Sequence, residues 1–156
     1  MLQEQDKAPA FAGPTNNEGH IDSKDLQGQA YLLYFYPKDN TPGCTKQAIY
    51  FTENKETFED LGIKIIGVSR DSVKKHDNFT TKQNLGIPLI SDEDGKICED
   101  FGVWVEKSMY GKKFMGIERS SFLVDAEGTI QNIWRKVKVG KHPEEVLEAA
   151  KALNAT

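Results

Sequence analysis

The hydrophobic positions of the chain fall into blocks of two alternating kinds. Two runs, residues 30–36 and 63–69, are almost unbroken in apolar character. Such runs are typical of strands that are covered on both faces, as in the centre of an α/β sheet. After each run, apolar residues recur every three or four positions, which is the spacing of an amphipathic helix. The pattern predicts a strand-helix-strand-helix order with right-handed crossovers and a mostly parallel centre.

The first predicted helix begins at Pro42 and ends at about Leu61, before Gly62. Thr41 followed by Pro42 is the order of an N-cap and a proline at the first helical position, where a missing N–H costs nothing. The apolar stripe of this helix consists of Cys44, Ala48, Phe51, Phe58 and Leu61. Cys44 is therefore expected on the core-facing side of the first turn.

Shorter patterns predict the other elements of a single α/β domain, residues 1–156, with a mixed central sheet. Turn residues at 16–19 indicate an N-terminal hairpin, and those at 126–128 a hairpin between 118–125 and 129–137. Helices are predicted at about 72–85, 96–101 and 143–153, and a short strand at 88–91. Residues 102–116 are interpreted as an irregular loop, with at most a portion of strand.

Composition and charge exclude several classes of function. The 20 basic and 24 acidic residues are mixed along the chain and give a net charge of −4, so no nucleic-acid partner is expected. We find no signal peptide and no membrane-spanning run, and therefore expect a cytoplasmic protein with two reduced cysteines and no membrane partner. His20, His76 and His142 have no paired spacing to each other or to a cysteine, so neither a metal nor a cofactor is predicted.

Cys44 is the residue whose surroundings favour chemistry. The first N–H groups of a helix have no internal partner, and the macrodipole places partial positive charge there. This position favours the thiolate, which is the reactive form of cysteine. Gly43 leaves the approach open, and Pro37 and Pro42 stiffen the loop. The competing interpretation is a small buried apolar residue, which is what most free cysteines are.

The string FYPKDNTPGCT, residues 35–45, contains Pro37, Thr41 and Cys44 in the spacing of the peroxiredoxin active-site signature. It resembles the bacterioferritin comigratory protein branch of that family. Further blocks in the expected order extend the resemblance over most of the chain: GVS at 67–69, LISD at 89–92, FGVW at 101–104, YGK at 110–112, GIER at 116–119 and FLVD at 122–125. The resemblance implies a thioredoxin-like fold with helices on both faces of the sheet.

The resemblance also implies a reaction. Cys44 would attack the O–O bond of hydrogen peroxide or an organic hydroperoxide and become a sulfenic acid. Thr41 would direct its hydroxyl at the first turn, Pro37 would wall the pocket, and Arg119 would stabilise the thiolate and hold the peroxide. From the residues alone, these three are equally a helix cap, a strand terminator and a surface arginine.

Two positions bear on how the sulfenic acid is reduced. Many members of the branch have a resolving cysteine five residues after the first, and this chain has Ile49 there, so that local cycle is excluded. Cys98 is interpreted as a packed core residue, since nothing places it within the Cα distance of about 7 Å that a disulfide to Cys44 needs. We favour a one-cysteine cycle completed by thioredoxin, glutaredoxin or a small-molecule thiol, with a two-cysteine cycle through Cys98 as the alternative. Gln47, where many relatives have glutamate, puts a supporting hydrogen bond in question.

Other functions compete with a peroxidase. A thiol-disulfide oxidoreductase normally has C-x-x-C, and here Gln47 takes the place of the second cysteine. A peroxide-sensing or chaperone-like protein could use Cys44 in the same way. Members of the branch are often monomers, and we expect a monomer here. The side chains of Trp104, Tyr110, Phe114 and Met115 are interpreted as a pocket rim, an association patch or the anchor of a surface loop.

Overall fold

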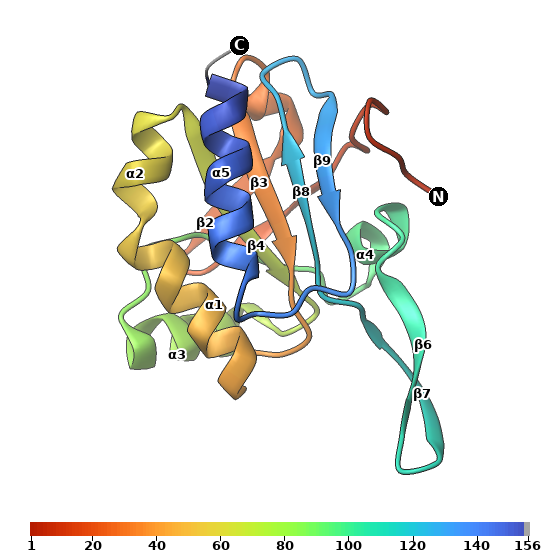
Figure 1. The fold of residues 1–156 in the computed structure, drawn as a ribbon. Helices are drawn as coiled ribbons and strands as arrows, with labels where there is room; N and C mark the ends of the chain where they lie inside the picture. Colours follow the sequence, from red (N-terminus) through yellow and green to blue (C-terminus); the bar gives the residue numbers. More distant parts are fainter. Residues whose placement is uncertain (155–156) are drawn as a thin grey trace.

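The computed structural model describes residues 1–154 and has a central sheet, a separate hairpin and helices on both faces of the sheet (Figure 1). Its elements in chain order are β1 (Ala12–Thr15), β2 (Gly19–Asp22), the 3-10 helix η1 (Ser23–Leu26), β3 (Ala30–Phe35), α1 (Pro42–Glu53), α2 (Lys55–Asp60), β4 (Ile63–Ser69), α3 (Val73–Gln83), β5 (Leu89–Ser91), α4 (Lys96–Asp100), β6 (Trp104–Met109), β7 (Lys112–Ile117), β8 (Ser120–Val124), β9 (Ile130–Trp134) and α5 (His142–Asn154).

The central sheet has the strand order β2-β1-β5-β4-β3-β8-β9. Strands β3, β4 and β5 are parallel to one another. The remaining neighbours pair antiparallel, so the hairpins β1-β2 and β8-β9 form the two edges. The predicted mixed sheet with a parallel centre and an N-terminal hairpin is confirmed.

Strand β3 shows why its sequence is apolar at every position. Tyr31, Leu33 and Phe35 belong to the hydrophobic cluster on one face of the sheet, and Leu32 and Tyr34 belong to the cluster on the other. Side chains of a strand point alternately to opposite faces, so a strand in the middle of a covered sheet has no solvent-facing position. Helices α1, α2, α3 and α5 contribute to the second cluster, whereas η1 and α4 contribute to the first.

The helix predicted from Pro42 to Leu61 is divided into α1 and α2 at Asn54, so its predicted length was wrong. The side-chain Nδ2 of Asn54 and its backbone N–H both donate to the carbonyl of Tyr50, at 2.9 and 3.0 Å. Asparagine competes in this way with the regular hydrogen bonds of a helix. The apolar spacing continues across the break, which is why the pattern alone did not show it.

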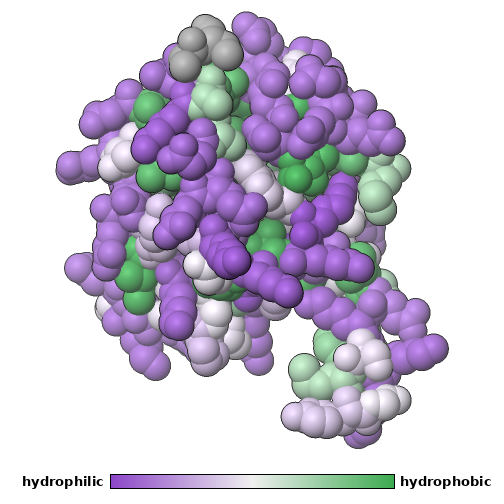
Figure 2. Space-filling model, in the orientation of Figure 1, coloured by the Kyte–Doolittle hydropathy of each residue, from purple (hydrophilic) through white to green (hydrophobic). Residues whose placement is uncertain are grey.

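Residues 102–116 are mostly not an irregular loop, as they were interpreted, because β6 and β7 form an antiparallel hairpin. Both turn residues, Tyr110 and Gly111, have positive φ angles of 51° and 78°. Such angles at both central positions match a hairpin turn that usually contains asparagine, aspartate or glycine, so the tyrosine obscured the signal. The hairpin, called the arm below, projects from the body (Figures 1 and 2) and has four exposed large hydrophobic residues, Met109, Tyr110, Phe114 and Met115.

Among residues 1–154, no helix combines the length and the apolar character that crossing a membrane requires.

Candidate active site

The fold brings the start of α1 and the end of the arm to the same edge of the sheet. Strand β3 ends at Phe35, and a loop of residues 36–41 leads into α1. Phe35 pairs with Ser120, the first residue of the neighbouring antiparallel strand β8. Arg119, which links β7 to β8, therefore lies beside the chain that leaves β3. This pairing explains how residues 75 positions apart in the sequence meet.

Arg119 bridges two side chains of α1. Its Nη2 donates to Cys44 Sγ at 3.2 Å, and its Nη1 donates to Gln47 Oε1 at 2.7 Å. The hydrogen bond that the glutamine put in question is therefore present, with a neutral acceptor. A carboxylate at this position would compete with the sulfur for the positive charge of the guanidinium, whereas an amide orients Arg119 without neutralising it.

Gly43 makes room for this arrangement. A Cβ atom at residue 43 would lie 3.3 Å from Arg119 Nη2 and 3.6 Å from Val139 Cγ2. The first of these contacts is tight, so a side chain here would press the guanidinium away from its place over the first turn. The sequence suggested only that glycine leaves the approach to sulfur open.

Arg119 lowers the pKa of two further basic side chains, Lys107 and His142. Burial lowers the pKa of Lys107 on β6, and Arg119 lowers it further, while Glu118 and Cys44 act in the opposite direction. Burial and then Arg119 lower the pKa of His142 to about 4, and His142 Nε2 lies 2.8 Å from Ser121 Oγ. His142 is therefore neutral at pH 7, so Arg119 and Lys107 are the cations that act on Cys44 from these elements.

Thr41 is the N-cap residue of α1, but its hydroxyl does not cap the helix as expected. Thr41 Oγ1 donates to the carbonyl of Lys38 at 2.7 Å, and its side chain accepts no hydrogen bond from the first turn. The loop turns back on itself through Asn40, at a φ of 60°, and brings the Lys38 carbonyl within reach. A local hydrogen bond of this kind cannot be read from the order Thr-Pro.

Pro37 is exposed and lines a groove of about 520 Å³ between the loop and the arm. The arm side of this groove includes Trp104, Lys107, Phe114 and Met115. Three of the four side chains that the sequence singled out in this region thus form a rim, whereas Tyr110 is 98% exposed at the turn. The structure places Cys44, Arg119 and Gln47 in direct contact, with Thr41 and Pro37 on the adjoining loop.

A model of the AhpC/TSA family matches residues 5–133. The chain belongs to this family. Peroxiredoxin Bcp of Xanthomonas campestris is 53% identical over 80% of the chain and 78% of that protein. A solved structure of the bacterioferritin comigratory protein of Xanthomonas campestris, described for its alkyl peroxide reduction activity, is 45% identical, covers 92% of each chain and has a TM-score of 0.87. A second solved structure is that of a yeast mitochondrial 1-Cys peroxiredoxin, described for its thiol resolving mechanism via glutathione/thioredoxin systems. It is 26% identical, covers 100% of this chain and 78% of that chain, and has a TM-score of 0.85.

The resemblance in the signature residues is thus confirmed at the level of the family, and the chain is a peroxiredoxin with the thioredoxin-like fold of its relatives. Peroxiredoxins are thiol-dependent peroxidases, so a reactive thiol is required. Both cysteines of this chain are free.

Cys98 lies in the cluster on the opposite face of the sheet from Cys44. It has no exposed surface, and burial raises the pKa of its thiol, with a further contribution from a hydrogen bond to Asp92. A disulfide needs Cα atoms within about 7 Å and Cβ atoms that point toward each other. Because the packed sheet separates the two thiols, they cannot pair without substantial unfolding.

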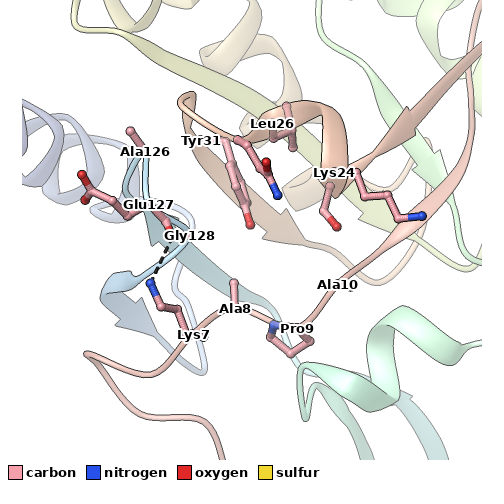
Figure 3. A pocket seen from close by; sticks show the side chains of 12 residues that line it. Lys7, Ala8, Pro9, Ala10, Lys24, Leu26, Tyr31, Ala126, Glu127 and Gly128 are labelled. Carbon is pink, nitrogen blue, oxygen red and sulfur yellow. Dashed lines mark hydrogen bonds between the residues drawn. The ribbon is translucent and has the colours of Figure 1, made fainter.

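A second cavity, of about 480 Å³, is lined by other residues than Cys44 and its partners (Figure 3). It is lined by the N-terminal segment, η1 and the β8-β9 turn, and it includes Tyr31, whose pKa burial raises to about 12. Tyr31 stands near the start of β3, whereas Cys44 follows its end. The lining of this cavity includes no cysteine, so it supplies no thiol.

The spacing of the histidines did not reveal that His76 meets two carboxylates, Asp39 and Asp71. One ligand-type atom from each of the three lies within 4.8 Å of the others. However, Asp39 binds Tyr36 and His76, Asp71 Oδ2 accepts two hydrogen bonds, and His76 Nε2 faces the carbonyl of Ile90. These atoms are already occupied by protein partners, so the cluster is a hydrogen-bonded network and gives no support for a metal.

Proposed function

We propose that Cys44 is the nucleophile of this peroxidase. Its thiolate attacks one oxygen of the peroxide, the S–O bond forms as the O–O bond breaks, and the departing oxygen takes a proton and leaves as water or alcohol. The observation that carries the proposal is the 3.2 Å contact between Arg119 Nη2 and Cys44 Sγ at the start of α1. A cationic donor binds a thiolate more strongly than a thiol, so this contact favours the reactive form.

Arg119 and Thr41 offer complementary groups to the substrate. The guanidinium donates hydrogen bonds beside the sulfur, where negative charge moves onto the departing oxygen. The Thr41 hydroxyl donates its hydrogen bond to the Lys38 carbonyl. The lone pairs of its oxygen can therefore accept a hydrogen bond from the O–H of the peroxide. A peroxide held between this acceptor and these donors would be oriented for attack along the O–O bond.

The groove beside Pro37 supports organic hydroperoxides as substrates in addition to hydrogen peroxide. One side of it is apolar, with Trp104, Phe114, Met115 and Ile117. Lys38, Arg70 and Lys107 add positive charge to its lining. An organic group too large for the immediate surroundings of Cys44 has an apolar surface to lie against, and Pro37 shields the approach from water.

The sulfenic acid on Cys44 would be reduced by a thiol from another molecule. Ile49 cannot resolve it, and Cys98 lies on the far face of the sheet. The similarity to a yeast 1-Cys peroxiredoxin that is resolved via glutathione/thioredoxin systems is consistent with such a cycle. We propose thioredoxin, glutaredoxin or a small-molecule thiol as the reductant, and a monomeric enzyme.

Mass spectrometry with a sulfenate-trapping reagent tests these assignments. Without reductant, the wild-type chain should consume one equivalent of peroxide and carry the trapped sulfenate on Cys44. Cys44→Ser should abolish both effects, and Cys98→Ser should change neither. Sustained turnover with an added thiol would separate a peroxidase from a peroxide sensor, and loss of that turnover in Cys98→Ser would contradict the one-cysteine cycle.

A further inference from the structure

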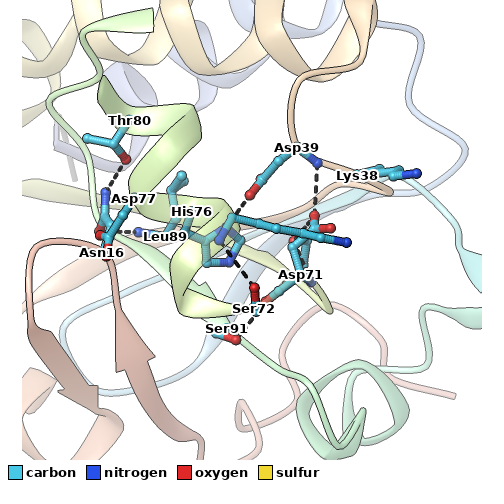
Figure 4. A network of polar contacts seen from close by, with 12 residues as sticks. Asn16, Lys38, Asp39, Asp71, Ser72, His76, Asp77, Thr80, Leu89 and Ser91 are labelled. Carbon is cyan, nitrogen blue, oxygen red and sulfur yellow. Dashed lines mark hydrogen bonds and ion pairs between the residues drawn. The ribbon is translucent and has the colours of Figure 1, made fainter. Parts of the chain in front are cut away.

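The loop between β3 and α1 is held by a buried network of polar groups that does not touch Cys44 (Figure 4). At its centre is Asp39, which is 7% exposed. One carboxylate oxygen of Asp39 accepts a hydrogen bond from Tyr36 Oη at 2.6 Å, and the other lies 2.6 Å from His76 Nδ1. Its backbone N–H donates to Asp71 Oδ2 at 2.8 Å. Asp39 is thus fixed on three sides.

His76 joins this loop to two elements of the body. It lies on α3, has no exposed surface, and places Nε2 2.9 Å from the carbonyl of Ile90 on β5. Because a carbonyl only accepts, Nε2 is the donor in its contact with Ile90, and Nδ1 is the ring nitrogen that contacts Asp39. The imidazole is therefore held at both nitrogens, and removal of either partner would leave a buried polar group unsatisfied.

Asp71 is also held by hydrogen bonds to the body of the protein. Ser69 Oγ donates to Asp71 Oδ2 at 2.8 Å, and Ser91 Oγ donates to the Asp71 carbonyl at 2.6 Å. The acceptor of the Asp39 N–H is therefore tied to the ends of β4 and β5. The loop is connected through these contacts to the rigid centre of the sheet.

One peptide group links the network to the proposed active site. The carbonyl of Lys38 accepts the hydrogen bond from Thr41, and the N–H of the same planar peptide group is the Asp39 N–H held by Asp71. A rotation of this peptide plane would move both hydrogen bonds at once. Between it and α1, Asn40 has a φ of 60°, an uncommon backbone conformation that persists only when the surroundings hold it.

We propose that Asp39 and His76 are positioning residues for the peroxidase reaction, which orient the Thr41 hydroxyl through the Lys38-Asp39 peptide group. This inference rests on the proposed function of Cys44. The pair makes no contact with Cys44 or Arg119, so the thiolate and its guanidinium partner persist without it. Loss of the pair therefore slows the attack on peroxide, which needs Thr41 in place, without slowing reactions that need only the thiolate.

The test compares two reactions of Cys44 in the double variant Asp39→Ala/His76→Leu, which removes both buried partners together. The second-order rate constant with hydrogen peroxide should fall by about 10- to 100-fold, since a misplacement of a positioning group by about 1 Å can cost about 100-fold in rate. The rate of alkylation by iodoacetamide, which requires the thiolate but no oriented peroxide, should stay within about twofold of the wild type across the pH range.

Thr80→Val is the matched control for loss of stability. Thr80 also lies on α3 and accepts a buried hydrogen bond from Asn16 Nδ2 at 2.7 Å, but it has no link to the loop (Figure 4). This variant should lower the melting temperature without changing the peroxide rate. Asp39→Asn, which preserves the shape of the side chain and the backbone bond to Asp71, provides a folded second variant in which the peroxide rate should fall by about three- to tenfold.

Two outcomes would overturn the inference. The peroxide rate could be unchanged in both loop variants, or peroxide and iodoacetamide rates could fall together, which would place the effect on the thiolate or on the whole fold. Failure of the proposed function would look different, because the wild-type chain itself would then react with peroxide no faster than an ordinary thiol.

Discussion

Cys44 and Cys98 each occupy the third position of a helix, yet the structure surrounds the two thiols with opposite charges. Cys44 on α1 receives a hydrogen bond from the Arg119 guanidinium. Cys98 on α4 lies beside Asp92. The carboxylate of Asp92 accepts hydrogen bonds from the backbone N–H groups of Ile97 and Cys98, at 3.1 and 2.8 Å. In α4 the positive end of the helix is thus already used by an internal anion. We therefore expect the start of α1 to favour a thiolate more than the start of α4 does.

The comparison also separates burial from reactivity. Cys44 is 2% exposed and Cys98 has no exposed surface, so the two thiols differ little in burial. What differs is the side chain that each sulfur faces, and the length of the helix behind it, which is 12 residues for α1 and 5 for α4. We therefore expect a substitution of Arg119, the neighbour of Cys44, to change the rate of reaction with peroxide more than any substitution near Cys98 does.

Removal of the guanidinium should have the largest effect. Arg119→Met should slow sulfenate formation on Cys44 by about 100- to 1,000-fold, as loss of one oriented donor at a developing charge commonly does. Arg119→Lys should recover little, since a single ammonium group cannot contact both Cys44 and Gln47 as the fork of donors does. Stopped-flow measurement of the oxidation rate gives the comparison, and a rate for Arg119→Lys close to wild type would contradict it.

The two thiols should differ by a smaller but still large factor in alkylation of the folded protein. Iodoacetamide should label Cys44 at least about 50 times faster than Cys98, because burial and Asp92 both raise the pKa of the Cys98 thiol. Peptide mass spectrometry over a time course reads both sites in one sample. In denaturant the two rates should become equal, and equal rates in the native state would show that the charge difference has no chemical consequence.

A tenfold effect or less is expected when the guanidinium is displaced without being removed. Gly43→Ala places a methyl group 3.3 Å from Arg119 Nη2, so the side chain must shift by a few tenths of an ångström, and the oxidation rate of Cys44 should fall by about three- to tenfold. Gly140→Ala is the matched control, since a Cβ there meets no atom within 4 Å and the rate should be unchanged. Equal rates for the two variants would mean that Arg119 can shift by this distance without slowing the oxidation of Cys44.

Features with a local signal were predictable from the sequence. The apolar runs of β3 and β4 and the Thr41-Pro42 order gave the central strands and the start of α1, because strand burial and helix initiation depend on adjacent residues. Arg119 was singled out only through the family resemblance. No local pattern distinguishes it from a surface arginine, because its partner lies 75 residues away.

Features that depend on tertiary contacts were missed. Asp39 and His76 are 37 residues apart and meet only because α3 packs beside the loop that leaves β3. The arm was misread because Tyr110 occupies a turn position that usually requires glycine or asparagine. The Thr41 hydroxyl was expected at the first turn, and its actual partner depends on the path of the loop through Asn40.

The smallest effect concerns His142, which burial and the neighbouring Arg119 keep neutral at pH 7. Burial and Arg119 lower the pKa of His142 from 6.5 to about 4. Between these two values the unfolded chain binds a proton that the folded chain does not, so the free energy of unfolding falls as the pH falls from 6.5 toward 4. We expect His142 to contribute about 2 kcal/mol to this loss, measured by urea denaturation at each pH.

His142→Gln separates this contribution from that of the carboxylates, because its amide can still bind Ser121 Oγ but does not titrate in this range. The difference in unfolding free energy between wild type and His142→Gln should therefore shift by about 2 kcal/mol in favour of the variant as the pH falls from 7 to 4. A difference for His142→Gln that does not change with pH would mean that the folded protein accepts a further cation in addition to Arg119 and Lys107. The charge around Cys44 would then be less tightly controlled than its contrast with Cys98 implies.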